Sequence, residues 1–185
     1  SLGGATAGDI RTLVAGRDGE LWIGTQGNGI GRYQNGQFQT INQADGLPRN
    51  YILSLYEDSE RTLWIGTVDR GICRYRNKRF DSITTKQGLP NNVIGHIEDD
   101  GLGHLWFSTQ QGLVRASRSN LNACADAQTN MLPSLVLGKG DGLATLAGSS
   151  GFTPSGFRAP DGALWFPTAR GIAVINPKSI QTNDV

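Results

Sequence analysis

The segment Leu63-Trp64-Ile65-Gly66-Thr67 decides the fold, because its pattern returns along the whole chain. The same five letters stand at Leu21-Trp22-Ile23-Gly24-Thr25, and two variants follow at Leu105-Trp106-Phe107-Ser108-Thr109 and Leu164-Trp165-Phe166-Pro167-Thr168. The first three tryptophans are 42 residues apart, and the fourth comes 59 residues after the third. A fixed period of this size is the sequence signature of a repeat architecture.

Two further markers keep the same period. One is Gly-Leu-Pro, at Gly46-Leu47-Pro48 and Gly88-Leu89-Pro90, with a decayed copy at Asp141-Gly142-Leu143. The other is a glycine and an aliphatic residue six or seven positions after each tryptophan, at Gly29-Ile30, Gly71-Ile72, Gly112-Leu113 and Gly171-Ile172. Three markers in phase indicate four copies of one structural unit, with 17 extra residues between the last two.

The second copy shows what this unit is. Short apolar or alternating runs at 52–58, 63–67, 72–76 and 79–84 predict four strands separated by tight turns. Four antiparallel strands with one tryptophan are typical of a β-propeller blade. We therefore predict an all-β propeller of about four four-stranded blades, covering about 9–50, 51–92, 93–150 and 151–180. Each tryptophan is expected to pack between neighbouring sheets, where the glycines after Ile23 and Ile65 allow a close approach.

Composition excludes several function classes. Charged residues are 18% of the 185, the net charge is +1 and the pI is near 7.8, so the basic stripe of a nucleic-acid binder is not expected. No apolar run reaches the roughly 18 residues of a membrane span, so this segment is not expected to insert directly into a membrane. Cys73 reads as a small buried thiol, and its spacing from Cys124 fits no metal or redox motif. No metal and no cofactor are predicted.

The combination of Leu-Trp-Ile-Gly-Thr, Gly-Ile-x-Arg-Tyr, Phe and Gly-Leu-Pro resembles the two-component regulator propeller repeat. The resemblance covers residues 9–177 and implies the extracytoplasmic, periplasmic sensor region of a bacterial hybrid histidine kinase or diguanylate cyclase. Residues 162–177 resemble the last blade of such a propeller, which precedes an immunoglobulin-like domain, a membrane helix and a cytoplasmic signalling module. The resemblance therefore implies signal transduction, with those domains as partners.

Members of that family generally close rings of seven blades, so four repeats are predicted to be the C-terminal part of a longer propeller. The fourth blade has a weak or missing outer strand, which residues 1–8 could complete. The outward faces of the first and last blades are expected to be apolar and uncovered. Further blades would cover them in a longer receptor, and in the isolated chain we expect a homodimer or higher oligomer.

The extra residues, 116–135, depart from the strand pattern. Residues 119–127 read as a short helix with Ser119 as its N-cap. We expect a surface excursion that packs Leu121 and Met131 against the blade edge, and a partner-binding element is the alternative.

Specificity is expected on one rim of the propeller. In a four-stranded meander, the loops between strands two and three and the connections between blades emerge on the same side. These loops carry amide, guanidinium and carboxylate groups, which suit a polar ligand bearing hydroxyls or carboxylates, such as a saccharide. The candidate ligand-binding residues are Gln26, Asn28, Arg49, Asn50, Asp69, Arg70, Asn91, Asn92, Gln110, Gln111 and Arg170.

No catalytic residues are predicted, and the chain is interpreted as a non-catalytic ligand-sensing or protein-interaction module. Two alternatives stay open. The blades also resemble those of streptogramin-lyase-like propellers, whose chemistry requires a histidine base and acidic metal ligands near the ring centre. Only His96, with Glu98 on the same strand face, occupies such a position. The second alternative is a purely structural propeller that binds proteins.

Overall fold

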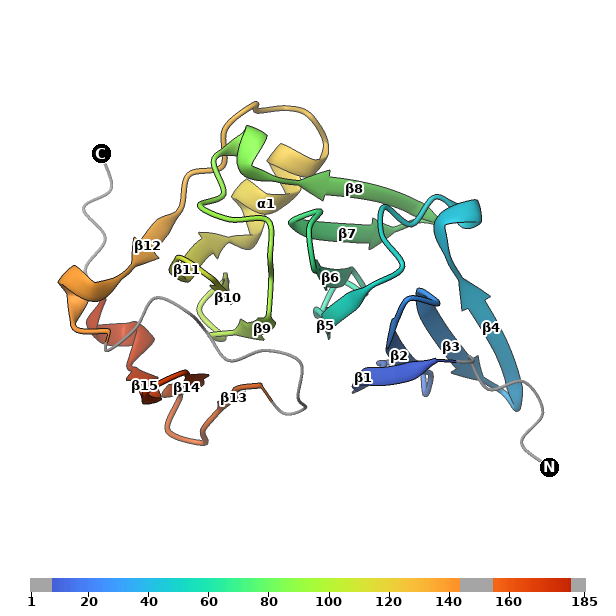
Figure 1. Ribbon diagram of the computed structural model, residues 1–185, viewed down its shortest axis with the longest axis horizontal. Coiled ribbons are helices and arrows are strands. Elements are labelled where there is room, and N and C mark those ends of the chain that lie inside the picture. The colour runs from blue at the N-terminus through green and yellow to red at the C-terminus, as the bar shows by residue number, and fades with distance from the viewer. Residues whose placement is uncertain (1–7, 144–154, 181–185) are drawn as a thin grey trace.

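The computed structural model describes residues 8–143 and 155–180, which form four antiparallel sheets arranged in an arc (Figure 1). Blade 1 consists of β1 (Asp9–Ala15), β2 (Leu21–Gln26), β3 (Ile30–Gln34) and β4 (Gln37–Ile41). Blade 2 consists of β5 (Ile52–Glu57), β6 (Leu63–Thr67), β7 (Ile72–Arg76) and β8 (Arg79–Ile83). Blade 3 consists of β9 (His96–Asp99), β10 (His104–Thr109), β11 (Gly112–Ser117) and β12 (Leu135–Leu137). Blade 4 has three described strands, β13 (Phe157–Arg158), β14 (Leu164–Thr168) and β15 (Gly171–Ile175).

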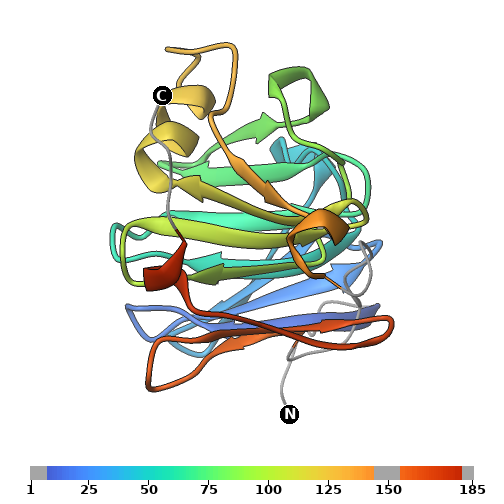
Figure 2. The same cartoon turned by 90° about the vertical axis from the view of Figure 1, so that its left-hand side faces the viewer.

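Each sheet is a meander in which consecutive strands are neighbours. The first strands, β1, β5, β9 and β13, lie nearest the middle of Figure 1, and the later strands fan outward. Figure 2, turned by 90°, shows the strands of the sheets running across the view, with α1 at the top. The predicted all-β propeller of four blades is therefore confirmed. Residues 1–8 were considered as a source of a fourth strand for blade 4, and residues 1–7 lie outside the described residues.

The tryptophan of the second strand joins each blade to the next. Trp22, Trp64 and Trp106 are 5%, 0% and 0% exposed. Each packs in a core cluster that includes residues of the following blade, such as Leu55 for Trp22 and Phe166 for Trp106. The predicted position of the tryptophans between sheets is thus confirmed for three blades.

Glycine lets two of these sheets approach each other closely. A Cβ added at Gly66 on β6 would lie 2.2 Å from Oγ of Ser54 and 2.5 Å from the backbone oxygen of Ile94, which leads into blade 3. No side chain fits in that space, because real Cβ atoms do not approach other atoms so closely. The backbone of blade 2 can therefore lie directly against the chain that starts blade 3.

A buried aspartate fixes the tryptophan in blades 2 and 3. Asp58 is 1% exposed, and one of its carboxylate oxygens accepts from Trp64 Nε1 at 2.9 Å. The other oxygen accepts from the backbone nitrogens of Glu60 and Thr62, which close the turn between β5 and β6. Asp100 repeats this arrangement with Trp106 Nε1 at 3.1 Å. One carboxylate thus stabilises the hairpin turn and orients the side chain that packs on the next blade.

The outer blades lack this aspartate. In blade 1 its position is taken by Gly16, and Trp22 donates instead to Glu57 of blade 2 at 3.1 Å. In blade 4 its position is taken by Ala159. Trp165 Nε1 is buried without a hydrogen-bond partner in the part of the chain that the structure describes. The tryptophan of blade 4 is also only half-buried, because no described blade follows it.

The inserted residues lie inside blade 3, between its third and fourth strands, and contain α1 (Arg118–Ala125). The N-cap is Ser117 rather than the predicted Ser119, because β11 runs to Ser117 and its hydroxyl accepts from the backbone nitrogen of Asn120. Leu121 is fully buried, as predicted. The prediction that Met131 packs against the blade is wrong, because Met131 is 60% exposed. The neighbouring Leu132 is buried instead.

The two cysteines are buried as free thiols. Burial in the core between blades 1 and 2 raises the pKa of Cys73 to about 12. Its predicted role as a small core residue is confirmed.

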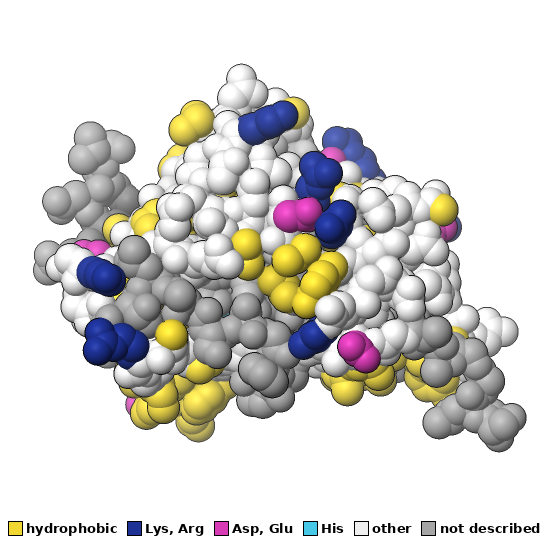
Figure 3. All heavy atoms as spheres, viewed as in Figure 1, with side chains coloured by type: hydrophobic (Ala, Val, Ile, Leu, Met, Phe, Trp, Pro, Cys, Tyr) yellow, Lys and Arg dark blue, Asp and Glu magenta, His cyan; other side chains and the backbone are white. Residues whose placement is uncertain are grey.

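Apolar side chains are exposed at both ends of the arc. Ile10 and Leu13 of β1 are 56% and 49% exposed, and a bulge between Ile10 and Thr12 brings them to the same outward face. At the other end, Ile172 and Val174 of β15 are 65% and 52% exposed. Figure 3 shows hydrophobic side chains along the lower margin of the molecule, over both ends. The two end blades therefore present the uncovered apolar faces expected of an open arc.

The buried carboxylate gives a first prediction. Asp58→Ala removes the acceptor of three donors in a buried turn, so we expect the free energy of unfolding to fall by about 3 kcal/mol. Denaturant unfolding followed by tryptophan fluorescence measures this loss. The control is Asp161→Ala, because Asp161 accepts only from the backbone nitrogen of Ala163 in an exposed turn of blade 4. Equal and small effects of both substitutions would contradict the role assigned to Asp58.

Candidate functional site

The loops between second and third strands and the connections between blades lie on one side of the propeller, here called the loop rim. It comprises residues 26–29, 49–50, 68–71, 91–92, 110–111 and 169–170. Backbone hydrogen bonds join its parts, since Gly29 N donates to Asn50 O and Gly71 N donates to Asn92 O, both at 2.9 Å. The candidate binding residues are thus brought to one edge, as the topology requires.

In each blade, a threonine near the end of the second strand stabilises the conformation of the loop that follows. Thr67 Oγ1 donates to Gly71 O at 3.0 Å and accepts from Arg70 N at 2.8 Å. The same pair of hydrogen bonds forms in the other blades, around Thr25, Thr109 and Thr168. The loops are therefore ordered before any ligand arrives, which lowers the entropy cost of binding.

Glycine is required where each of these loops returns to the sheet. Gly71 has a φ of +70°, and a Cβ there would lie 2.0 Å from the backbone oxygen of Ile83. This explains why a glycine follows each tryptophan after six or seven residues. Neither the threonine nor this close approach was identified as a loop constraint from the sequence, although both residues recur in all four copies.

Three of the predicted binding residues support the framework. Asn50 Oδ1 accepts from the backbone nitrogen of Gln43, and Asn92 Oδ1 accepts from that of Thr85, both at 2.9 Å. These bonds attach the short 3₁₀ turns after β4 and β8 to the rim. Asn91 Oδ1 accepts from Val93 N at 2.8 Å. A role of these amides in ligand binding stays a prediction.

Three other predicted residues are paired with neighbours. Arg49 of the first connection lies 3.3 Å from the Asp69 carboxylate, and both side chains are nearly half exposed. Gln26 accepts a hydrogen bond from Arg11. These groups are reachable from solvent, but a ligand would have to compete with or extend the existing pairs.

The remaining predicted residues are exposed, and their side chains have no partner in the described part of the chain. In the described part of the chain, the side chains of Asn28, Arg70, Gln110, Gln111 and Arg170 are exposed and make no hydrogen bond or ion pair. They follow one another from blade 1 to blade 4 along the rim. Their amide and guanidinium groups are mostly hydrogen-bond donors, which match carboxylate and hydroxyl oxygens.

His96, the candidate base of the lyase alternative, lies on β9, the inner strand of blade 3. His96 Nε2 is 3.3 Å from Glu98 Oε2, and the two side chains are 16% and 20% exposed. The imidazole ring packs edge-on against Phe166 of blade 4, with centroids 5.9 Å apart. Within residues 8–143 and 155–180, no three His, Cys, Asp or Glu side chains gather as a metal site would need. This geometry indicates a packed structural histidine.

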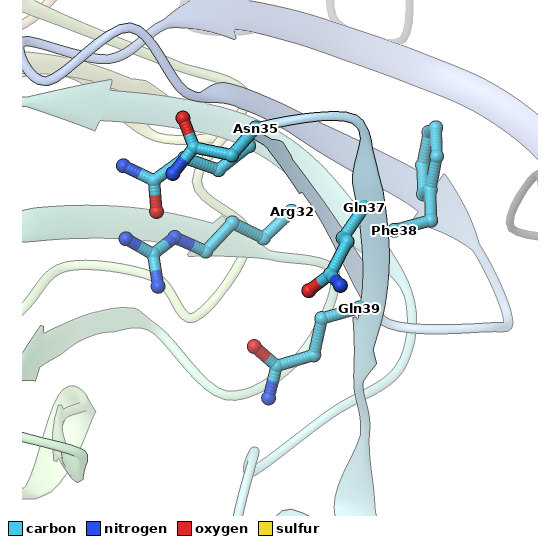
Figure 4. A pocket seen from close by; sticks show the side chains of 6 residues that line it. Arg32, Asn35, Gln37, Phe38 and Gln39 are labelled. Carbon is cyan, nitrogen blue, oxygen red and sulfur yellow. The ribbon is translucent and has the colours of Figure 1, made fainter.

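A second surface feature lies on the outer hairpin of blade 1. A hollow of about 380 Å³ is lined by residues of β3, β4 and the turn between them (Figure 4), which are Arg32, Gln34, Asn35, Gln37, Phe38 and Gln39. No sequence motif indicates this hollow, because it is formed on one face of two paired strands.

Comparison with known proteins supports one family. The model of the two-component regulator propeller matches residues 4–27, 46–69 and 88–111. No curated protein matches the sequence. Among the helices of the described residues, none is long and apolar enough to cross a membrane.

Solved structures with this fold include extracellular domains of two-component systems. The extracellular domain of a putative hybrid two-component system from B. thetaiotaomicron is 25% identical, with a TM-score of 0.74 over 91% of this chain and 22% of that one. A second such domain from the same organism is 22% identical, with a TM-score of 0.76 over 94% of this chain and 24% of that one. The chain thus spans under a quarter of the length of these proteins.

A virginiamycin B lyase from Staphylococcus aureus is 18% identical, with a TM-score of 0.59 over 94% of this chain and 56% of the lyase. At that identity the likeness concerns the fold alone. The family match, by contrast, falls on the strands and Gly-Leu-Pro connections that the repeat analysis identified. In each of the first three blades, the segment that holds the first and second strands matches the two-component regulator propeller repeat.

Proposed function

We propose that the chain is a non-catalytic sensor module in the periplasmic part of a bacterial signal-transduction receptor. The observation that carries the proposal is the repeat itself, together with its likeness to extracellular domains of hybrid two-component systems. Signalling domains, and further blades of a larger propeller, would be its partners in the same receptor.

The loop rim is the part of the surface best suited to sensing. Its loops are braced by the threonine hydrogen bonds, whereas the side chains of Arg70 and Arg170 project from them without internal partners in the described chain. A rigid backbone that presents free donors favours binding of a preformed polar ligand. We therefore propose that an oligosaccharide, above all one with carboxylate groups, binds across neighbouring loops.

Two observations favour sensing over lyase chemistry. His96 is packed against Phe166, and its only close acidic neighbour in the described chain is Glu98. The donors of the loop rim lie on loops of all four blades rather than converging on this histidine. The alternative of a purely protein-binding propeller shares the same rim and is separated by the ligand test below.

Ligand binding gives the second prediction. A thermal-shift screen with neutral and uronic-acid oligosaccharides should raise the melting temperature with at least one compound. Arg70→Ala and Arg170→Ala should each weaken that binding about tenfold, because each removes a charge-assisted hydrogen bond. The matched control is Arg61→Ala, since Arg61 is an exposed arginine in the turn between β5 and β6, away from the loop rim.

Three results would count against this proposal. The absence of any shift would favour a protein-binding role, and an equal loss with Arg61→Ala would place the site elsewhere. Conversion of a bound compound in the presence of Mg²⁺, abolished by His96→Ala, would establish the lyase alternative.

The exposed end faces give the third prediction. We propose that further blades cover them in the receptor and that the isolated chain covers them by self-association. Sedimentation equilibrium at tens of micromolar should show a species larger than 19.8 kDa. Replacing both Ile172 and Val174 by Glu should return the monomer, whereas Met131→Glu, equally exposed but on the insertion, should not. A wild-type chain that stays monomeric would contradict the proposal.

A further inference from the structure

The helix α1 packs against blade 2 through its buried residues Leu121, Cys124 and Ala125, and one arginine of the outer hairpin binds its C-terminal end. Arg74 of β7 has a side chain only 4% exposed. It donates to the backbone oxygen of Asn122 at 3.4 Å and to Asn122 Oδ1 at 3.0 Å, and it also bonds the carboxylate of Asp126. Asp81 on the paired strand β8 accepts from Arg74 Nη2, the nitrogen that also bonds Asp126, at 2.9 Å.

These contacts are made to the C-terminal end of the helix. α1 ends at Ala125, with Asp126 as its C-cap, so Asn122 belongs to the last turn. The backbone oxygen of Asn122 also accepts from the backbone nitrogen of Asp126 at 2.8 Å, and the last turn carries the negative end of the helix dipole, which favours a cation. The hydrogen bond from Arg74 lowers the pKa of Asp126, and the charges of Arg79 and Arg76 lower it further. This face of blade 2 is thus a receptor for a helix C-terminus.

The same face recurs on blade 1. In the hairpin β3–β4, Arg32 pairs with Gln39 and Gln34 pairs with Gln37, as Arg74 pairs with Asp81 and Arg76 with Arg79 in β7–β8. A shift of 42 residues maps every lining residue of the blade 1 hollow onto blade 2. The counterparts of Arg32, Gln34, Asn35, Gln37, Phe38 and Gln39 are Arg74, Arg76, Asn77, Arg79, Phe80 and Asp81.

The hollow presents donors where blade 2 holds the helix. The side chain of Arg32 is 34% exposed, and its nearest carboxylate is Glu20 at 3.4 Å. Its Nε is buried without a hydrogen-bond partner in the described residues. Figure 4 shows Arg32, Gln37 and Gln39 pointing to the same side of the hairpin, opposite to Phe38. Guanidinium and amide N–H groups therefore line a surface with room for carbonyl and carboxylate oxygens.

The hollow on blade 1 is shallower than the site on blade 2 that holds α1, because aromatic rings fill its inner part. Next to α1, blade 3 has Ala116 opposite Leu105, and Leu121 of the helix packs into the same core cluster. At the corresponding position blade 2 has Tyr75, which packs edge-on against Trp22 and stacks on Phe80. These rings already fill the inner part of the groove between blades 1 and 2. Only its outer, polar part is open, which suits the end of a helix rather than its whole apolar face.

We propose that the hollow on blade 1 binds the C-terminal turn of a helix from another polypeptide, one whose last turn carries an Asp or Asn side chain. The site is separate from the loop rim, so it would bind a protein partner independently of a ligand sensed there. α1 on blade 2 provides the template for the contact, with Arg32 in the place of Arg74.

The probe for the experiment is a peptide with the sequence of residues 117–128, kept helical by a lactam that replaces the side chains of Ser119 and Ala123. This constraint removes most of the ordering cost of a short helix. In ¹⁵N-labelled protein, the side-chain amide resonances of Gln34, Gln37 and Gln39 should shift in a saturable way. A peptide with Asp126→Lys should bind about tenfold more weakly, because it loses the charged partner of Arg32.

Protein variants decide between the hollow and other surfaces. Arg32→Ala should weaken binding about tenfold, and Gln37→Ala, at an exposed position, should weaken it without disturbing the fold. Arg170→Ala, at an exposed arginine on blade 4, should bind as the wild type does. The proposal is overturned if no amide shift saturates, if the shifts centre on α1 and Arg74, or if Arg32→Ala and Gln37→Ala bind unchanged.

Discussion

The contact between the tryptophan of one blade and the sheet of the next is the interaction on which the rest of this structure depends. A buried tryptophan removes about 200 Å² from water, which corresponds to about 5 kcal/mol of hydrophobic free energy. Trp64 and Trp106 are fully buried, and Asp58 and Asp100 each fix one of them through the indole nitrogen. Because the same carboxylate also closes the hairpin turn, the position of a strand and its packing on the next blade are set together.

The packing of the tryptophans also determines the geometry of the loop rim. Each loop follows directly on the second strand, whose place is fixed by its tryptophan. A threonine at the end of that strand then joins both sides of the loop, as Thr67 does with Gly71 and Arg70. Variation in the exposed loop side chains can therefore change binding without changing the sheet, which is the usual division between scaffold and site.

Much of the fold could be predicted because the repeat places equivalent residues in register. The expected strands 63–67 and 72–76 coincide with β6 and β7. The aspartate that binds the indole was missed, since a carboxylate six residues before a tryptophan looks like an ordinary turn residue. The helix start was placed two residues late, because the end of β11 depends on pairing with β10 that a local pattern does not reveal.

The candidate sites were predicted less completely. Topology brought the loop residues to one rim, but the internal bonds of Asn50 and Asn92 depend on backbone groups of 3₁₀ turns. The role proposed for the hollow on blade 1 depends on the comparison of its hairpin with that of blade 2, where Arg74 binds α1. Sequence alone assigned the outer arginines no role, because their environment differs from blade to blade.

The central claim is that each blade is stabilised by the blades that cover its two faces, and native-state hydrogen exchange tests it most directly. Blades 2 and 3 have a described neighbour on both sides, whereas blades 1 and 4 each have an exposed apolar face. At low micromolar concentration, where self-association is weakest, the amides of β6 and β10 should exchange only through global unfolding. Those of β14 and β15 should exchange through local opening with a lower free energy. Equal protection of all four sheets would contradict the account.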